Sequence, residues 1–280
     1  MKKFGFTMVE MIVVIVVMGI LSAGTFVSLK HLYQRTAKSK TLSNLSNDSQ
    51  IIVDQIAALM YDRVPSAVWG YEENVTNKET IYNIVSGDYR IVEWYGVASE
   101  SLKAGHYSGF VDMDDSDGNR TLRTYNINGS DINATLQKKF GLIRSIQNSL
   151  GVVFAGAFDT GNDVNISSID SIETGSIVLN QKPQEIYEKY YLVDSAYAIA
   201  RGDDISCSDT NETDTLYLIY NYRPWMGNSI CDGNATILSR ETKAFEVGLV
   251  NNSIYFNLTL SHHIKGIDKN ITISKQKVVF

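Results

Sequence analysis

Residues 5–21 read GFTMVEMIVVIVVMGIL, a stretch of apolar side chains that contains a single charge, Glu10. The wider segment from Phe6 to Leu29 has no other charged residue and is long enough to cross a bilayer. A carboxylate at the centre of a spanning helix costs about 2.5–3.5 kcal/mol, and less near the helix end. The acid at position 10 is therefore the feature that an account of this segment has to explain.

Two common kinds of N-terminal segment leave this acid unexplained. Lys2, Lys3, the apolar core and the small residues 22–24 favour a secretory signal peptide. Such peptides carry no acid at the position of Glu10, and the sequence does not change character after Ala23. An ordinary membrane anchor gives no reason for Glu10 at all.

The segment resembles the N-terminus of type IV prepilins and type II secretion pseudopilins. The resemblance lies in a short basic leader that ends in Gly5, followed by Phe6, Thr7, Glu10 and an unbroken apolar helix. In that family a membrane-embedded prepilin peptidase cuts after the glycine and methylates the new N-terminal residue. The resemblance therefore implies a leader of residues 1–5, cleavage between Gly5 and Phe6, and methylation of the Phe6 amine.

Cleavage would leave a positive amine on Phe6 within apolar surroundings, and a buried charge needs a partner. We expect Glu10 of a neighbouring subunit to meet that amine. Such a pair adds little net stability but fixes register, which apolar helix faces alone would leave free to slip. Phe6 and Glu10 are therefore the expected assembly residues, with other pilin or pseudopilin subunits, prepilin peptidase and an inner-membrane assembly platform as partners.

A helical pattern continues beyond the apolar segment. Apolar residues recur at approximately helical spacing at Leu32, Leu45, Ile52, Ile56, Leu59 and Met60. Pro65 is the first firm stop, and polar residues 44–49 favour a local break. We therefore expect a membrane or filament-core half at 6–29, an amphipathic half at 30–64 and a periplasmic β-rich domain at 66–280.

Short strand-like segments separated by turns follow Pro65. The pattern predicts strands at 89–97, 106–113, 152–158, 175–180, 189–199, 215–222 and 271–280. Residues 243–261 predict a hairpin that turns at Asn251-Asn252, and 136–150 predict the one later helix. The fold class is α+β, one long N-terminal helix packed on an antiparallel sheet, which is also the fold that the pilin resemblance implies.

Within the family the chain looks more like a minor subunit. Many main pilins have a proline where this chain has Val27, and the globular part is large for a main subunit. Its size, C-terminal hairpin and final strand loosely resemble J-type minor pseudopilins.

Composition disfavours some functions. The formal net charge is −6 and the pI is about 5.3, which argues against a general nucleic-acid binder. The sequence has no HExxH, GxSxG, P-loop or GxGxxG pattern, so we expect neither an enzyme nor a bound cofactor. The alternative is a single-pass anchored periplasmic enzyme or binding protein whose site the sequence does not reveal.

The two cysteines, Cys207 and Cys231, indicate the compartment. A single pair of this kind usually forms a disulfide in an exported protein. The positive-inside rule gives the opposite orientation, because Lys30, Arg35, Lys38 and Lys40 follow the apolar segment. We expect the disulfide, and with it a periplasmic domain held by an inner-membrane helix until assembly into a filament.

An acidic segment, VDMDDSDGNR (111–120), is similar to a calcium loop. Its candidate ligands are Asp112, Asp114, Asp115 and Asp117. The EF-hand pattern does not fit, since Asp117 occupies the place of the glycine. A solvated acidic turn is the alternative.

Asn-x-Ser/Thr sequons occur twelve times in the chain. Seven have an acid two residues upstream, where about one is expected by chance, and six of these seven are the predicted sites. They are Asn74, Asn133, Asn165, Asn211, Asn234 and Asn270. The extended pattern resembles the acceptor of a bacterial oligosaccharyltransferase, and predicts glycosylation with all six in surface loops. Asn beside Asp is also common in turns, which is the alternative.

These features together predict a structural subunit of a type IV pilus or a type II secretion pseudopilus. The sequence does not distinguish secretion, motility, DNA uptake and adhesion as the task of the filament.

Overall fold

We describe the protein from a computed structural model. It describes residues 7–72, 78–81, 89–114, 120–155, 164–251, 253–264 and 269–279. The chain forms two compact units, one of residues up to Asp48 with Ser261–Ile273, the other of Ser49–Leu260 with Ser274–Phe280. Each unit is described by itself.

Helix α1 runs without interruption from Met8 to Tyr61. The break expected at residues 44–49 is wrong, because the helical hydrogen bonding continues through these polar residues, of which Ser49 is itself buried. Asn44 and Asn47 are exposed, while Leu45 is buried. The helix ends before Pro65, which lies in strand β1 (Arg63–Tyr71). The pairing of β1 with β3 is irregular between Arg63 and Val68, and such irregular places tolerate a proline.

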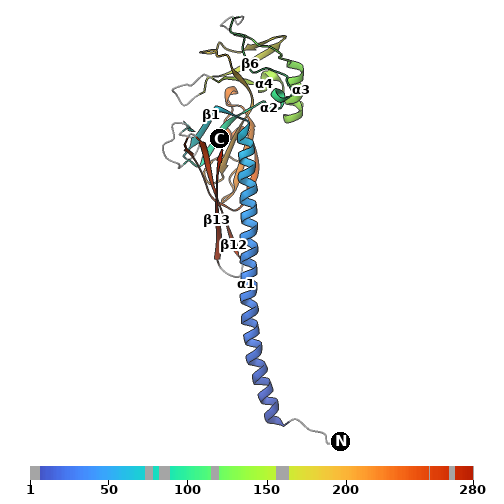
Figure 1. The fold of residues 1–280 in the computed structure, drawn as a ribbon, viewed down its shortest axis with the longest axis vertical. Helices are drawn as coiled ribbons and strands as arrows, with labels where there is room; N and C mark the ends of the chain where they lie inside the picture. The colour runs from blue at the N-terminus through green and yellow to red at the C-terminus, as the bar shows by residue number, and fades with distance from the viewer. Residues whose placement is uncertain are drawn as a thin grey trace. The chain divides into compact units, whose positions relative to one another are not determined.

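The larger sheet belongs to the second unit and has ten strands, paired antiparallel throughout (Figure 1). Besides β1, these are β2 (Lys78–Thr80), β3 (Ile91–Val97), β4 (Thr121–Arg123), β5 (Gly151–Phe154), β6 (Ile166–Glu173), β7 (Ser176–Leu179), β8 (Tyr190–Arg201), β9 (Leu216–Tyr222) and β10 (Asn234–Ser239). The order is β2-β1-β3-β8-β5-β6-β7-β4, and β10 pairs with β9, which pairs with β8.

Strand β8 organises this sheet because one of its edges serves two partners. One edge pairs with β3 through residues 193–199. The other edge pairs with β5 through residues 190–193 and with β9 through residues 196–201. Asp194 and Ser195 lie where the partner changes, so the sheet forks at these two residues.

A second sheet has the order β11-β12-β13, formed by Thr242–Val250, Ser253–Ile264 and Lys269–Val279. The hairpin predicted at 243–261 is confirmed, since Val250 pairs with Ser253 across Asn251 and residue 252. The final strand is also confirmed. Lys277 of β13 binds Asp54 of α1 at 3.0 Å, so this strand and the C-terminal end of α1 are linked within one unit.

The helix expected at 136–150 is two shorter helices, α3 (Gly129–Phe140) and α4 (Ile146–Ser149), and α2 (Ser99–Lys103) was not expected. Gly141 caps α3 with φ 99° and ψ 165°, a conformation outside the helical region that ends the helix. Two short 3₁₀ helices cover Pro224–Met226 and Ile230–Asp232. Figure 1 shows α2, α3 and α4 close to β6.

The strand expected at 106–113 is wrong as well. Only isolated bridges, Phe110 to Lys189 and Val111 to Thr124, form there. Gly109 has φ 78°, which an extended strand does not contain. The strand expected at 152–158 ends at Phe154, and its last residues, 156–158, lie outside the described part of the chain. The predicted class is confirmed: a long N-terminal helix precedes an antiparallel sheet domain, an α+β fold of the pilin type.

Candidate functional site: the apolar end of the first helix

Helix α1 begins with a capping box formed by Thr7 and Glu10. The Thr7 N–H and hydroxyl donate to Glu10 Oε2 at 2.9 and 2.8 Å, and the Glu10 N–H donates to Thr7 Oγ1 at 3.4 Å. The Thr7 carbonyl accepts the first helical hydrogen bond, from Met11. These contacts satisfy N–H groups that a helix start leaves unpaired.

The capping role of Glu10 at the start of α1 was not expected from the sequence. The pattern Thr-x-x-Glu before an apolar run is the signal that predicts it. The capping box uses only one of the two carboxylate oxygens. No residue that the structure describes donates a hydrogen bond to Glu10 Oε1, so the second oxygen can accept a further donor.

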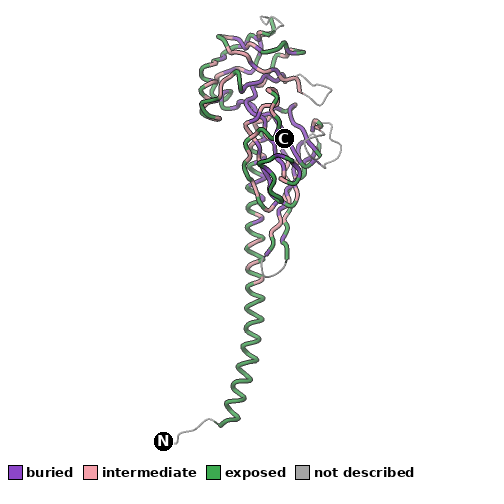
Figure 2. Tube along the Cα trace, turned by 180° about the vertical axis from the view of Figure 1, so that it is seen from behind, coloured by how far each residue is buried: buried purple, intermediate pink, exposed green. Residues whose placement is uncertain are grey.

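The side chains after the cap are exposed on every side of the helix (Figure 2). Met8 is 84% exposed, Ile15 66% and Phe26 75%. Among the described residues, α1 is the one helix that is long and apolar enough to cross a membrane. A soluble monomer rarely leaves so large an apolar surface in water, so lipid or partner helices have to cover it all round.

Comparison with protein-family models adds direct evidence about this segment. Residues 1–26 match the model of the prokaryotic N-terminal methylation motif. The prepilin-type motif expected from the sequence is thereby confirmed, and membrane anchoring fits it. Neither a search of curated proteins nor one of solved structures found a match. Within the methylation motif, Gly5 and Phe6 lie outside the described residues, whereas Thr7 and Glu10 have the geometry given above.

The structure contains the disulfide between Cys207 and Cys231, with the two Cα atoms 5.2 Å apart. It joins the β8–β9 connection to the 3₁₀ helix Ile230–Asp232 between β9 and β10. Both connections that flank β9 are therefore tied together.

The candidate calcium ligands are only partly described. The Asp114 N–H donates to Asp112 Oδ1 at 3.2 Å, and the Tyr125 hydroxyl donates to Asp112 Oδ2 at 2.9 Å. Asp115 and Asp117 lie outside the described residues. Within the described ranges, no group of three or more acidic, histidine or cysteine side chains is placed to hold a metal. Calcium binding here stays a prediction.

The six predicted glycosylation sites do not all lie in loops, so that expectation is wrong. Asn211 is exposed in a loop, and Asn165 is half-buried just before β6. Asn133 lies within α3, Asn234 begins β10 and Asn270 lies in β13. Asn74 falls outside the described residues. Glycosylation itself stays a prediction.

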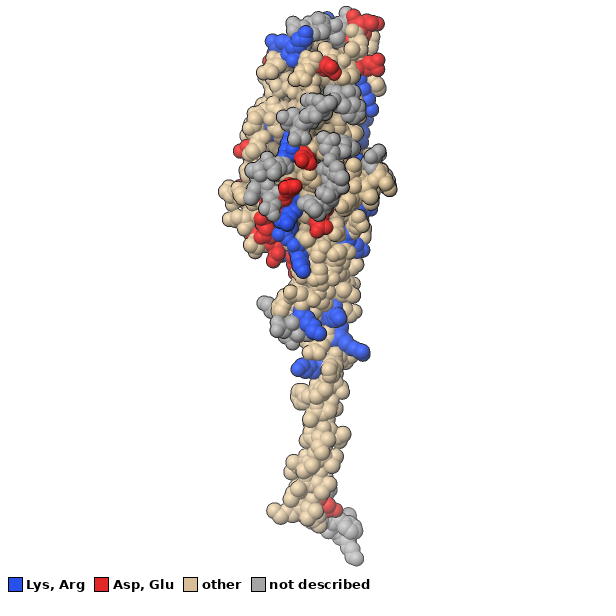
Figure 3. All heavy atoms as spheres, turned by 90° about the vertical axis from the view of Figure 1, so that its left-hand side faces the viewer, with Lys and Arg blue, Asp and Glu red and all other residues tan. Residues whose placement is uncertain are grey.

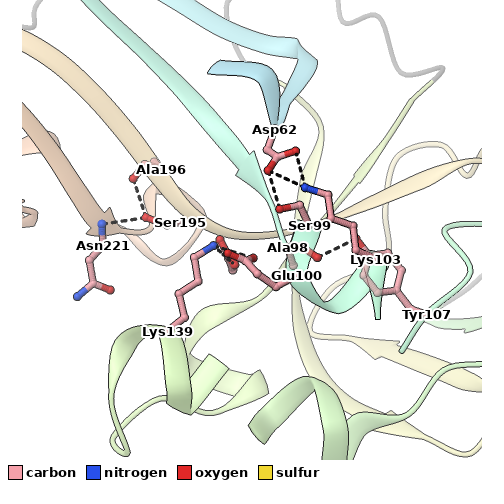
Figure 4. A network of polar contacts seen from close by, with 11 residues as sticks. Asp62, Ala98, Ser99, Glu100, Lys103, Tyr107, Lys139, Ser195, Ala196 and Asn221 are labelled. Carbon is pink, nitrogen blue, oxygen red and sulfur yellow. Dashed lines mark hydrogen bonds and ion pairs between the residues drawn. The ribbon is translucent and has the colours of Figure 1, made fainter. Parts of the chain in front are cut away.

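A polar cluster around the buried Asp194 lies at the fork of β8, and it was not expected from the sequence (Figure 4). Lys139 of α3 binds Asp194 Oδ2 at 2.9 Å and Glu100 of α2 at 3.1 Å. Nearby, Asp62 accepts a hydrogen bond from Ser99 at 2.8 Å and binds Lys103 at 3.3 Å. A carboxylate within the apolar run YYLVDSAYAI was the available signal, because a buried charge needs a partner.

This cluster links β8 to α2 and α3 and does not form an open reactive site. Asp194 is 3% exposed, and burial raises its pKa to about 6 although Lys139 acts in the opposite direction. Burial alone would lower the pKa of Lys139, but the carboxylates of Asp194 and Glu100 outweigh it and raise that pKa. Beside the cluster, Ser195 Oγ accepts from the Asn221 N–H at 2.8 Å and donates to the Ala196 carbonyl at 2.7 Å.

Proposed function

We propose that the chain is a structural subunit of a type IV pilus or type II secretion pseudopilus, cut before Phe6 and assembled through α1. The methylation motif at residues 1–26 is the observation that carries the proposal. The apolar surface of α1 and the pilin-like fold support it. The proposed role is non-enzymatic, with a minor subunit preferred over a main one because Val27 stands where many main pilins have proline.

The proposed location follows from the same segment. The helix from Phe6 to Leu29 holds the subunit in the bacterial inner membrane, with the disulfide-bonded domain in the periplasm, until assembly moves it into the filament. Prepilin peptidase, the assembly platform and other subunits are the proposed partners.

Glu10 has two separable duties in this proposal. Oε2 closes the capping box within the chain, and Oε1 is open to the Phe6 amine of a neighbouring subunit. The first duty needs an acceptor oxygen, whereas the second needs a negative charge.

Three substitutions separate these duties in an assembly assay. Glu10→Gln keeps an acceptor oxygen but removes the charge, and Glu10→Val removes both. Thr7→Val keeps the charge but removes the side-chain half of the cap, which costs about 1 kcal/mol of helix stability. We expect both Glu10 variants to insert into the membrane and yet enter sheared filaments poorly, while Thr7→Val enters them nearly as the wild type does.

Normal assembly of Glu10→Gln would contradict the registration role and leave capping as the sole function of the acid. A loss in Thr7→Val as large as that in Glu10→Gln would also contradict a charge-specific role, because Thr7→Val keeps the charge of Glu10. Membrane fractionation of each variant provides the control for insertion.

A further inference from the structure

A groove of about 620 Å³ lies within the first unit, between α1 and the β12–β13 ends. Six α1 residues line it, Ser28, His31, Leu32, Gln34, Arg35 and Lys38, and four come from the two strands, Ile264, Lys269, Asn270 and Ile271. The α1 residues follow the spacing of one helix face. The groove therefore begins at Ser28, where the uncharged segment of α1 ends.

The groove combines a cationic rim with apolar walls. Arg35, Lys38 and Lys269 supply positive charge, and none of the three has an ion pair with a described residue. Leu32, Ile264 and Ile271 supply the apolar lining. No acid occurs between Glu10 and Asp48, so α1 offers these cations no carboxylate nearby. Residues 265–268, which lie outside the described part of the chain, contain one lysine and one aspartate, so they leave the net charge of this region unchanged.

Figure 3 shows Lys and Arg side chains gathered on α1 just beyond its uncharged stretch, without Asp or Glu among the described residues there. The helix rises 1.5 Å per residue, so Arg35 lies about 9 Å beyond Leu29 along the axis. The headgroup region of one leaflet is about 5–8 Å thick. Helical side chains lean toward the N-terminus, and long cationic side chains extend to reach polar surroundings. Arg35 and Lys38 can therefore reach headgroup phosphates.

We propose that this groove binds the phosphate of an anionic phospholipid, with Arg35, Lys38 and Lys269 around the headgroup and Leu32, Ile264 and Ile271 against the adjoining glycerol and acyl carbons. The groove would then give each subunit a fixed depth in the leaflet before assembly. It also accounts for cations that follow the apolar segment on the side where the positive-inside rule disfavours them. The inference rests on the proposed membrane placement of residues 8–29 but not on the filament role.

The test is a lipid titration of the full chain in detergent, followed by native mass spectrometry. The chain is produced without a glycosylation system, because a glycan on Asn270 would occupy the groove. The probes are phosphatidylglycerol, phosphatidylcholine and inorganic phosphate. The groove variant is Arg35→Gln with Lys38→Gln. The matched control is Lys30→Gln with Lys40→Gln, which removes two charges from the same stretch of helix at positions that do not line the groove.

We expect the groove variant to bind phosphatidylglycerol about 30-fold more weakly, because each cation at an anionic lipid surface contributes roughly five-fold. The control should lose less than about three-fold, because its cations stand outside the groove. Phosphatidylcholine should bind the wild type weakly, and equimolar inorganic phosphate should not displace phosphatidylglycerol. Circular dichroism checks that the helix persists, as glutamine preserves helix propensity.

Three results would overturn the inference. Equal loss in the two variant pairs would mean diffuse charge attraction without a groove. Equal binding of the two lipids would remove the anionic preference. Displacement by equimolar phosphate would identify a free anion as the ligand. None of these results depends on cleavage before Phe6, so the filament proposal is tested separately.

Discussion

Asp194 shows at the scale of one residue how the fold accommodates a charge that the sequence places in a central strand. Burial raises its folded pKa to about 6, well above the ordinary value of an aspartate. The folded protein therefore binds this proton more tightly than the unfolded chain does. Between about pH 4 and pH 6 the contribution of Asp194 to stability falls as pH rises, by on the order of 3 kcal/mol, and above that it stays constant.

We predict that Asp194→Asn flattens the fall in the free energy of unfolding over this pH window, since asparagine does not titrate. Urea denaturation of both proteins at several pH values measures it. The wild-type profile also contains opposite contributions from carboxyls with lowered pKa, such as Asp54, so the difference between the two profiles is the relevant quantity. Identical slopes in the two proteins would contradict the assigned titration.

Some features of single residues could be predicted from the sequence, and others could not. Glu10 stood out because burying a carboxylate in an apolar segment costs free energy. The disulfide was expected because the chain has a single pair of cysteines. The capping contact of Thr7 and the cluster around Lys139 were missed. The capping contact follows from the local pattern Thr-x-x-Glu. The cluster around Lys139 depends on α2 and α3 packing near β8, which the spacing of residues in the sequence does not predict.

Helix α3 illustrates at the element scale how one glycine outweighs a periodic pattern. Apolar spacing across 136–150 favoured one helix, yet Gly141 ends it with φ 99°. We predict that Gly141→Ala lowers the free energy of unfolding by about 1–3 kcal/mol, because residues other than glycine rarely adopt this conformation. Leu142→Ala is the control, expected to change stability by less than about 0.5 kcal/mol since Leu142 is 85% exposed. Comparable losses in both variants would contradict the conformational explanation.

The disulfide joins the two connections that flank β9. It closes a loop with a sequence separation of 24 residues. We predict that replacing Cys207 and Cys231 together with serine lowers the free energy of unfolding by about 3 kcal/mol, measured by urea denaturation. Reducing agent should lower the stability of the wild type similarly and leave the double variant unchanged. A wild type that is insensitive to full reduction would contradict a stabilising role.

Long periodic elements were the ones that the sequence predicted well. The first helix, β8, β9 and the β11–β12 hairpin were all expected. Strand β1 was not expected because Pro65 signals a helix stop, and β2, β4, β6 and β10 were not expected because they are short or polar. Their pairing partners, rather than their own residues, make these segments strands.

At the scale of the whole molecule, the chain contains two different parts. One is a helix whose apolar surface is unfavourable in water, and the other is a domain with its own buried core. That combination, with the methylation motif, makes a filament subunit the function that accounts for the most observations. The task of the proposed filament would depend on its other components. Secretion genes or pilus genes beside this one would distinguish the two systems.

Mass spectrometry of the N-terminus, on protein purified from its native membrane or filament, tests the central claim most directly. The proposed function predicts a mature chain that begins at Phe6 and carries one methyl group on its amine. A chain that begins at Met1, or near Gly24 as a secretory signal peptide would leave it, would contradict the assignment.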